Sequence, residues 1–393
     1  MQHILAQRLE TLRNAGLFRQ LRTIRHYTGS HAEVDGEPLV LFSSNDYLGY
    51  ATHPTLLAAA RAASCSATSA TASPLVNGFW EEHHLLVREL CNWKGVEDAM
   101  LFPAGYQGNV ALMSALLHSP HDQVFSDALN HASIIDGCRL GRGTVHVYRH
   151  NDIEHLESLL VAHVGNGLRT IVTDAVYSMD GDVAPLVALL ELAKRHNALL
   201  VVDEAHSTGV LGARGQGVTE IFGSHPDHLL TFGTFGKALG SMGAYATGTQ
   251  LQIDYLRNMA RGYIFSTAFP PGIAHVNRTA VQMLAKGEQV DALKHNIRAL
   301  AEGLTRAGWD FSQQKTAIFP IVVGEAETAV DLSLGLRQAG FFVPAIRYPT
   351  VARGTARLRI ALNANHTPEA IERLIVSLIR EYNNTGLPKK GDV

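Results

Sequence analysis

The chain has 393 residues, of which 46% are hydrophobic and 18% are charged, and its 33 basic and 36 acidic residues give a formal charge of −3. This composition is typical of a globular protein long enough for two domains, and it excludes a fibrous or disordered chain. The near balance of charge argues against binding to nucleic acid or to an anionic membrane, so we expect small-molecule chemistry.

The cysteines, at positions 65, 91 and 138, are too few and too scattered for a disulfide framework or a Cys-x-x-Cys metal site. This usage predicts a reducing compartment, and with it a cytoplasmic location. No apolar stretch reaches the roughly 18 residues of a membrane span, so we expect no membrane segment.

The first residues predict an amphipathic helix that docks on the rest of the protein. Apolar side chains recur at helical spacing, at Ile4, Leu5, Leu9, Leu12 and Leu17. The arginines in this region also resemble a mitochondrial presequence, but the acidic residue at position 10 disfavours that alternative. We therefore predict an N-terminal helical arm over residues 1–43.

Between about residue 95 and residue 245, short apolar runs alternate with amphipathic stretches. The apolar runs predict strands at 99–102, 123–126, 170–173, 199–202 and 229–232. The amphipathic stretches at 153–164 and 186–196 predict helices. This alternation is typical of an α/β fold with a mostly parallel central sheet flanked by helices, and we assign residues 44–285 to this large domain.

The last third of the chain has a different pattern. After Pro270 and Pro271 it is helical through about residue 308. It then predicts strands at 318–323, 341–344 and 357–362, a helix over 329–338 and a closing helix from Pro368. We expect residues 286–393 to form a smaller α+β domain.

Polar residues follow the predicted strands of the large domain. They are Gly105 and Tyr106, His131, Ser178, Asp203 and His206, Thr234 and Lys237. Open parallel sheets bind ligands beyond the carboxyl ends of their strands, so we expect one site assembled from several strand ends.

Lys237 and Asp203 are the most informative pair. A lysine can hold an aldehyde as a Schiff base, while a carboxylate beneath a pyridine nitrogen keeps that ring protonated and makes it an electron sink. Asp203 follows four apolar residues, so it ends a buried strand and needs a cationic partner. A pyridinium meets that need, and so would an arginine of a buried salt bridge. The pair predicts an enzyme that uses pyridoxal phosphate (PLP).

Two nucleotide motifs fit less well. A phosphate-binding loop needs a glycine where Thr231 stands and a serine or threonine where Ala238 follows the lysine. The glycines between Gly209 and Gly217 superficially resemble a dinucleotide loop, but they do not lead directly from a strand into a helix. We interpret them as a turn with a close backbone approach.

Other polar residues allow two interpretations each. His131 would lie over a pyridine ring or be a packing residue, and the remaining histidines lack the spacing of a zinc site, so we predict no metal. Gly105 and Tyr106 at a helix start, with Thr234, would bind a phosphate or be turn residues. Arg359 would clamp a substrate carboxylate or form an inter-domain salt bridge.

Taken together, these motifs resemble the α-oxoamine synthase family, PLP enzymes of the aspartate-aminotransferase fold (fold type I). The resemblance runs almost from end to end of the chain. It is carried by Phe42–Gly49, Leu101–Asn109, Asn130–Ser133, Val176–Asp182, Val202–Gly209, Thr234–Lys237 and Phe265–Pro271.

The resemblance implies a role for each matching residue. Lys237 would bind the cofactor covalently and then act as a base, Asp203 would pair with the ring nitrogen, and His131 would stack on the ring. Ser178 and His206 would contact the ring oxygen. The cofactor pocket and its phosphate would be served by Gly105, Tyr106 and Thr234, with Thr267 from the neighbouring subunit. The residues facing substrates would be Arg22, Asn45, Thr350 and Arg359, at the interface of a homodimer.

The stretch from Pro344 to Ile360 is similar to the family members that join L-alanine to pimeloyl-CoA, or to a pimeloyl carrier protein. That reaction releases the thiol and carbon dioxide and gives 8-amino-7-oxononanoate for biotin biosynthesis. The alternatives are another α-oxoamine synthase, which would use glycine with succinyl-CoA or acetyl-CoA, and a PLP-binding protein without synthase activity.

One segment departs from the family pattern. Residues 64–75 contain no glycine where the family has a glycine-rich stretch, and Pro74 stiffens the segment. Left-handed backbone conformations, which glycine tolerates, become costly there. The departure leaves the identity of the acyl chain and of its carrier open.

Overall fold

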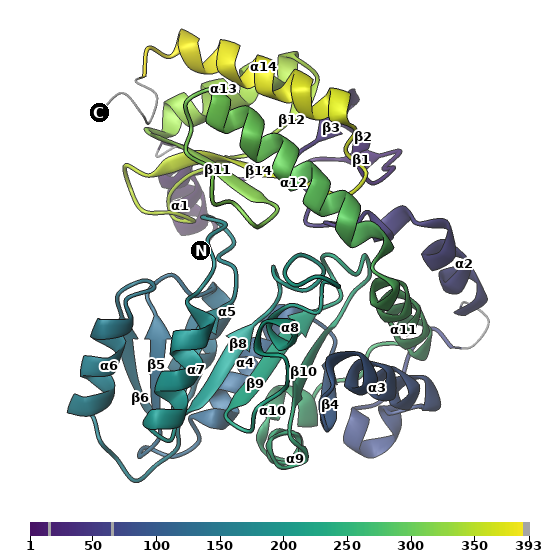
Figure 1. Ribbon diagram of the computed structural model, residues 1–393, viewed down its shortest axis with the longest axis vertical. Helices are drawn as coiled ribbons and strands as arrows, with labels where there is room; N and C mark the ends of the chain where they lie inside the picture. Colours follow the sequence, from purple (N-terminus) through teal and green to yellow (C-terminus); the bar gives the residue numbers. More distant parts are fainter. Residues whose placement is uncertain (15–16, 64–66, 388–393) are drawn as a thin grey trace.

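The computed structural model describes residues 1–14, 17–63 and 67–387. The described chain has a large lobe around a seven-stranded sheet and a smaller lobe beside it (Figure 1). The smaller lobe combines strands from the beginning of the chain with the last third of the sequence.

The seven-stranded sheet has the strand order β4-β10-β9-β8-β7-β5-β6. Its strands are β4 (Asp98–Phe102), β5 (Gln123–Asp127), β6 (Thr144–Tyr148), β7 (Arg169–Asp174), β8 (Leu199–Asp203), β9 (Leu229–Thr234) and β10 (Ala244–Gly248). Strand β10 runs antiparallel to its neighbours β4 and β9, and the other pairs are parallel. This arrangement confirms the mostly parallel sheet and all five predicted strands.

The sequence did not predict β6 and β10. Strand β6 lies at the sheet edge with four of its five side chains at least partly exposed, so it lacks the apolar run of a central strand. Strand β10 reads Ala-Tyr-Ala-Thr-Gly, and alanine and glycine are depleted in strands. Both strands form because their neighbours in the sheet supply the hydrogen-bonding partners.

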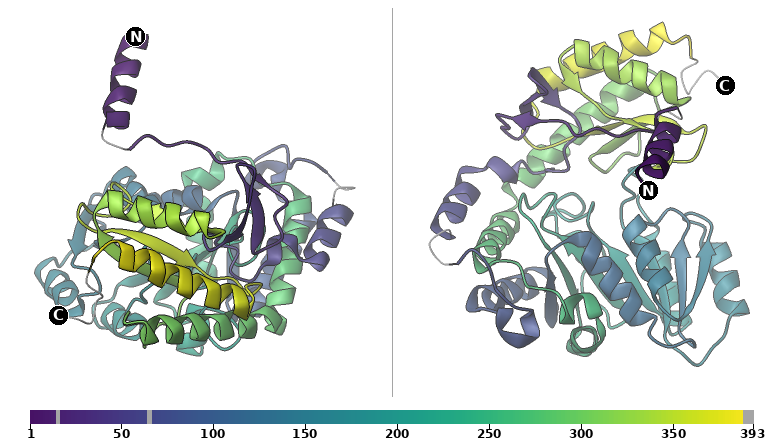
Figure 2. Two further views of the ribbon diagram at one scale, coloured as in Figure 1. Left: turned by 90° about the horizontal axis from the view of Figure 1, so that it is seen from above. Right: turned by 180° about the vertical axis from the view of Figure 1, so that it is seen from behind.

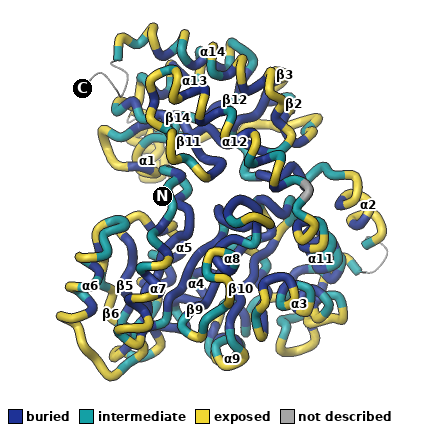
Figure 3. Tube along the Cα trace, viewed as in Figure 1, coloured by how far each residue is buried: buried dark blue, intermediate teal, exposed yellow. Residues whose placement is uncertain are grey.

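Helices cover both faces of this sheet. The helices of this lobe are α2 (Pro54–Ala63), α3 (Glu81–Lys94), α4 (Gly105–Leu116), α5 (Ala132–Leu140), α6 (Ile153–Ala162), α7 (Leu186–Arg195), α8 (Val218–Phe222), α9 (Gln250–Met259), α10 (Arg261–Ile264) and α11 (Pro271–Lys286). Helix α2 packs on α11, beside the sheet (Figure 1). Along β8, Val201 packs in the core cluster that contains α4, whereas Leu200 and Val202 pack in the cluster that contains α6 and α7. Strand β8 is therefore apolar on both faces and buried (Figure 3), which explains its continuous apolar run.

The smaller lobe contains the predicted α+β elements. A sheet of order β11-β14-β13 is formed by β11 (Ile318–Gly324), β13 (Ala345–Ile346) and β14 (Ala356–Ala361). The lobe also contains the helices α12 (Glu288–Arg306), α13 (Ala326–Gln338) and α14 (Pro368–Asn384). Helix α14 begins where predicted, because Thr367 caps the amide of Ala370 and Pro368 occupies the first helical position.

A second small sheet joins the two ends of the chain. Strands β1 (Ile24–Arg25), β2 (His31–Val34) and β3 (Glu37–Leu41) pair in sequence order, and β3 then pairs in parallel with β12 (Phe341–Phe342). The sequence predicted β12 but neither its partner nor the three N-terminal strands. The division of the chain at residues 43 and 285 stays a prediction.

The N-terminal segment forms the predicted helix, α1 (Gln2–Asn14), but the predicted docking is wrong for the single chain. The helix extends away from both lobes (Figure 2), and none of its residues is buried. Its apolar side chains Ile4, Leu5, Leu9 and Leu12 are between 41% and 54% exposed. The helix presents an apolar stripe that no surface of the same chain covers within the described residues.

Two kinds of feature are absent from residues 1–14, 17–63 and 67–387. No helix in these ranges combines the length and the apolar character needed to cross a membrane. No group of three or more His, Cys, Asp and Glu side chains is arranged to hold a metal ion. Cys138 is buried and Cys91 is half-buried, while Cys65 lies outside the described residues.

Candidate active site

The predicted site residues gather at the carboxyl ends of the parallel strands. Asp203 is the last residue of β8, Thr234 is the last residue of β9, and Lys237 lies in the turn that follows. The segments after β5 and β7 bring His131 and Ser178 to the same edge of the sheet. Strand β14 of the smaller lobe contributes Arg359 from the opposite side.

A chain of polar contacts begins at the Lys237 amine. Lys237 Nζ lies 2.7 Å from His206 Nε2, and His206 Nδ1 lies 2.6 Å from the Tyr47 hydroxyl. The Tyr47 hydroxyl is 3.3 Å from Asn45 Oδ1. The Lys237 amine can donate to Nε2 in either protonation state; Nδ1 of His206 then carries the ring proton and donates to Tyr47, which in turn donates to Asn45.

Burial makes the neutral form of Lys237 more accessible than that of an ordinary lysine. Burial lowers the pKa of Lys237 to about 8 from its ordinary 10.5, although the nearby negative charges of Asp203 and Asp174 act against this shift. Burial and the positive charges of Lys237 and Arg359 also lower the pKa of His206 well below its ordinary value. Lys237 is therefore a nucleophile and base near neutral pH, and His206 is a neutral ring beside it.

The glycine-rich turn after His206 lets the backbone approach the segment that carries Lys237. Gly209 has a φ of +77°, and a Cβ atom at that position would lie 2.7 Å from the Cβ of Ala238. Only glycine combines that conformation with that separation. The predicted close backbone approach is confirmed at this residue.

Asp203 is 4% exposed, and both of its carboxylate oxygens accept hydrogen bonds. The Ala205 amide lies 2.8 Å from Oδ1, and Asn109 Nδ2 lies 2.6 Å from Oδ2. Both donors are neutral, and no cation among the described residues lies within ion-pair distance of Asp203. Asn109 lies in one of the motifs behind the family resemblance, but no role was predicted for it from the sequence.

Asn109 also connects Asp203 to the segment that carries His131. Asn109 Nδ2 lies 3.0 Å from Ser133 Oγ, and that hydroxyl lies 2.7 Å from His131 Nδ1. His131 caps helix α5, since its Nδ1 also accepts from the Ser133 amide. The ring is fixed at Nδ1 while the residue as a whole is exposed, so a ring face is available to a ligand.

The N-terminus of α4 offers donors for an anion. No side chain of the described residues caps this helix, which begins at Gly105 after the extended Ala104. Amide groups and the helix dipole make such an end a ready phosphate site. Thr234 Oγ1 is the nearest atom to the Cβ position of Gly105, at 3.8 Å. The Thr234 hydroxyl already donates to the Gly243 carbonyl at 2.8 Å.

The sequence left open whether Arg359 clamps a substrate carboxylate or forms an inter-domain salt bridge. Arg357 forms an ion pair with Asp180 and so joins the two lobes. Arg359 is 5% exposed and donates from Nε to the Ser178 carbonyl at 2.5 Å and from Nη2 to Asn45 Oδ1 at 3.2 Å. Both acceptors are neutral, and Arg359 has no ion pair with a described carboxylate.

Some predicted site residues stand apart from this cluster. Arg22 is exposed and pairs with Asp35 at 3.0 Å, and Thr350 is exposed in a turn where its amide donates to the Arg347 carbonyl. Tyr106 is half exposed, donates to Asp136 and lies edge-on to His131, with 6.5 Å between ring centroids. Thr267 is also exposed. In the described chain, no hydrogen bond or ion pair joins these four residues to Lys237 or Asp203.

The glycine-free segment lies partly outside the described residues, at 64–66. Within the described part, Thr71 has a φ of +64°, the left-handed conformation that the missing glycines would have tolerated. The neighbouring Ala72 carbonyl accepts the amide of Ala268 at 3.0 Å. The segment is therefore tied to the loop that carries Thr267.

The sequence model of the family described as aminotransferase class I and II matches residues 37–378. A protein of Trichlorobacter lovleyi named 8-amino-7-oxononanoate synthase is 44% identical over 388 residues, which cover 98% of this chain and 99% of the relative. The chain belongs to the aminotransferase class I and II family and, within it, to the 8-amino-7-oxononanoate synthases.

Solved structures agree with this assignment. A structure of SPT with a PLP internal aldimine has a TM-score of 0.90 and 28% identity, and the match covers 98% of each chain. The 8-amino-7-oxononanoate synthase of Francisella tularensis has a TM-score of 0.75 and 28% identity, with coverage of 89% of this chain and 99% of that chain. The predicted α-oxoamine synthase resemblance and the fold are confirmed, and pyridoxal phosphate is the cofactor.

The site fits this cofactor. A buried carboxylate without a cationic partner suits a pyridinium, and an uncapped helix N-terminus suits a phosphate. The amine of Lys237 has a depressed pKa and suits an aldehyde, while the accessible ring of His131 suits stacking.

The pKa of Lys237 leads to a testable pH dependence. Only a neutral amine attacks an aldehyde, so in protein stripped of PLP the rate of covalent capture should rise with pH through a midpoint near 8. The measurement is the growth of the absorption band of lysine-bound cofactor between pH 6 and pH 11. Nα-acetyl-lysine is the control and should rise through the ordinary value for an amine. A protein midpoint near 10.5 would contradict the site described here.

Proposed function

We propose that this chain catalyses the decarboxylative condensation of L-alanine with pimeloyl-CoA, or with a pimeloyl carrier protein. The products are 8-amino-7-oxononanoate, the free thiol and carbon dioxide, and the reaction belongs to biotin biosynthesis in the cytoplasm. The name and full-length coverage of the relatives support this choice of substrates. The observation that supports it most directly is a pair of buried, opposite charges, Asp203 and Arg359, that lack ion-pair partners in the described chain.

These two charges are complementary to a cationic cofactor ring and an anionic substrate. The cofactor supplies an electron sink when its ring nitrogen is protonated, and Asp203 keeps that proton in place. Arg359 would bind the amino-acid carboxylate with its guanidinium, whose present acceptors are neutral carbonyl oxygens. Asn45, 3.2 Å from Arg359, would help to fix the orientation of that carboxylate.

Lys237 and its neighbours would handle the proton. The Lys237 amine, with a pKa near 8, can accept the proton from the substrate Cα and return it after carbon dioxide leaves. His206 and Tyr47 hold the amine by a directed hydrogen-bond chain, so its lone pair has a fixed position. His131 would stack on the cofactor ring, and Ser178 and His206 would contact its oxygen.

The remaining predicted residues fit the same proposal. Gly105, Tyr106 and Thr234 would contribute to the cofactor pocket and the phosphate site, as the uncapped start of α4 supports. Arg22 and Thr350 would face the acyl thioester. Both are exposed in the single chain, where their side chains are accessible to a large substrate.

We also propose that the protein is a homodimer with the active site at its interface. The exposed apolar stripe of α1 supports this, as does Phe265, which is 71% exposed two residues before Thr267. Thr267 would then reach the phosphate site of the partner subunit. Light scattering should give twice the chain mass of 42.6 kDa, and a single-chain mass at micromolar protein would contradict the dimer.

The substrate proposal is tested by measuring released thiol for L-alanine, glycine and L-serine, each with pimeloyl-CoA, succinyl-CoA and acetyl-CoA. L-Alanine with pimeloyl-CoA should give the highest kcat/KM. In the same assay, Arg359→Lys should lower kcat/KM for L-alanine by about 30- to 150-fold, since a hydrogen-bonded charge contact contributes about 2–3 kcal/mol. Arg195→Lys, at an arginine paired with Glu157 at the end of α7, is the control and should change little. Turnover of glycine with succinyl-CoA alone would contradict the proposal.

A further inference from the structure

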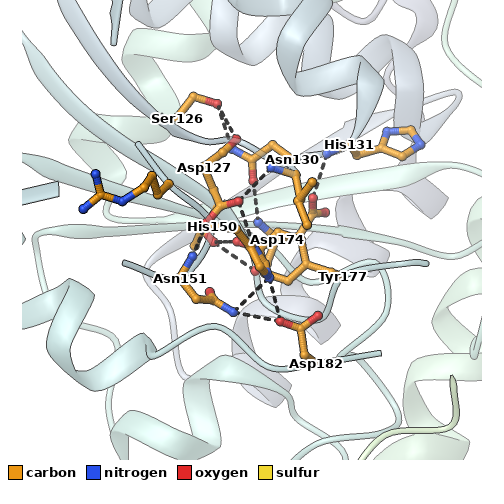
Figure 4. A network of polar contacts seen from close by, with 12 residues as sticks. Ser126, Asp127, Asn130, His131, His150, Asn151, Asp174, Tyr177 and Asp182 are labelled. Atoms are coloured by element: carbon orange, nitrogen blue, oxygen red, sulfur yellow. Dashed lines mark hydrogen bonds and ion pairs between the residues drawn. The ribbon is translucent and has the colours of Figure 1, made fainter. Parts of the chain in front are cut away.

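His150 lies outside the residues that the sequence analysis assigned to the site. It follows β6, the edge strand of the large sheet, and its side chain is 27% exposed. Its ring lies between two carboxylates (Figure 4). Nδ1 is 2.9 Å from Asp127 Oδ1, and Nε2 is 2.8 Å from Asp182 Oδ2.

The charge state of His150 suits this arrangement. Carboxylates only accept hydrogen bonds, so both ring nitrogens must donate, and the ring is then an imidazolium. Burial opposes the charge, but the hydrogen bonds and negative charges of Asp127 and Asp182 outweigh it and raise the pKa of His150 to about 10. The ion pairs therefore persist throughout the neutral pH range.

Asn151 forms a second connection between the carboxylates of Asp127 and Asp182. Its amide donates to Asp127 Oδ2 at 2.9 Å, and its Nδ2 donates to Asp182 Oδ2 at 2.8 Å. Asn151 adopts a φ of +54°, a left-handed conformation that asparagine tolerates better than most non-glycine residues. The surrounding contacts hold this conformation, as expected of an over-determined site.

Asp127 begins the turn that carries His131. Its Oδ1 accepts the Leu129 amide at 2.8 Å, and the turn continues through Asn130, whose Oδ1 accepts the Asp174 amide. Asp174 Oδ2 in turn accepts the amide of His131 at 2.8 Å, while the His131 side chain points away from the network (Figure 4). The contacts therefore fix the backbone of His131 and leave its ring available.

Asp182 ends the turn that carries Ser178. Its carbonyl accepts the Tyr177 amide at 3.1 Å, and the Tyr177 ring lies edge-on to His150 with 4.4 Å between centroids. On its other side, this turn contacts the smaller lobe through Arg359, which binds the Ser178 carbonyl. His150 is thus the direct ionic connection between the two turns.

We propose that His150 is a positioning residue that fixes the turn carrying His131 relative to the turn carrying Ser178. The inference deepens the proposed function and rests on it, because both turns deliver residues to the cofactor ring. His150 itself touches neither cofactor nor substrate. It acts by keeping the turn of His131 and the turn of Ser178 in fixed positions around the cofactor ring.

The test uses the full-length holoenzyme with His150→Ala and His150→Gln. His196→Gln is the matched control, because His196 also lies near a carboxylate, 3.6 Å from Glu157 Oε1, but at the end of α7 away from both turns. The readouts are the visible circular dichroism of bound PLP, the Kd for PLP, and kcat and KM for thiol release. Thermal melting of each protein without PLP reports any general loss of stability.

His150→Ala should raise the Kd for PLP about tenfold or more and weaken the visible circular dichroism, since misplacement of binding groups by about 1 Å has effects of this size. The kcat should fall more than KM for L-alanine rises, because Arg359 lies on β14 and keeps its contact with Asn45, outside both turns. His150→Gln should recover part of the dichroic signal by donating to one carboxylate, and His196→Gln should match the wild type. Partial recovery of the dichroic signal in His150→Gln distinguishes a positioning role from a general loss of folding.

The possible results have distinct meanings. If the wild type binds PLP and both His150 variants match it within twofold in Kd and dichroic signal, the positioning role is wrong. If His150→Ala does not fold, the same comparison is made with His150→Gln alone. A His150 variant with a lower melting temperature but an unchanged dichroic signal also contradicts the positioning role. A wild type without a lysine-bound cofactor band contradicts the proposed function instead.

Discussion

The site depends on a negative charge buried at the end of a central strand. Asp203 ends β8, where hydrogen bonds from Asn109 and Ala205 satisfy its oxygens but leave its charge uncompensated within the described chain. An unpaired buried carboxylate costs several kcal/mol, so its retention requires a cationic partner that arrives with a ligand. The protonated ring of PLP would meet this requirement, and Lys237 and the open start of α4 lie at the same edge of the sheet as Asp203.

A complementary charge comes from the smaller lobe. Arg359 is buried against neutral acceptors, while Arg357, two residues earlier on the same strand, makes the inter-lobe ion pair. This division of roles keeps one guanidinium available for a carboxylate and uses the other to hold the lobes together. The turn from Tyr177 to Asp182 receives both arginines on one side and His150 on the other, so it mechanically connects the edge of the large sheet to the smaller lobe.

The sequence predicted the main chemistry because its signals are local. Asp203 follows an apolar run, Lys237 lies in a short glycine-bearing turn, and both are recognisable without knowing their neighbours. The roles of Asn109 and Tyr47 were missed because their partners lie 94 and 159 residues away in the sequence. The pairing of β3 with β12 joins positions some 300 residues apart and has no local signal either. The residues around Arg359 allowed two interpretations, and the structure shows no ion pair between Arg359 and a described carboxylate, so the clamp on a substrate carboxylate stays a prediction.

The docking of α1 was predicted wrongly for the single chain because periodicity is also a local signal. Apolar periodicity predicts that one face of a helix will be covered, but it does not say by which surface. Among the residues that the structure describes, none covers the stripe of α1, and the second subunit of the proposed dimer would cover it.

The central claim is that one PLP molecule is bound covalently at Lys237 with its ring nitrogen at Asp203. The most direct measurement is borohydride reduction of the holoenzyme followed by proteolysis and mass spectrometry of the peptides. The account predicts a phosphopyridoxyl group on Lys237 and a loss of ring protonation, seen as a shifted absorption band, in Asp203→Asn before reduction. A phosphopyridoxyl group on any other lysine, or an Asp203→Asn protein with the spectrum of the wild type, would contradict it.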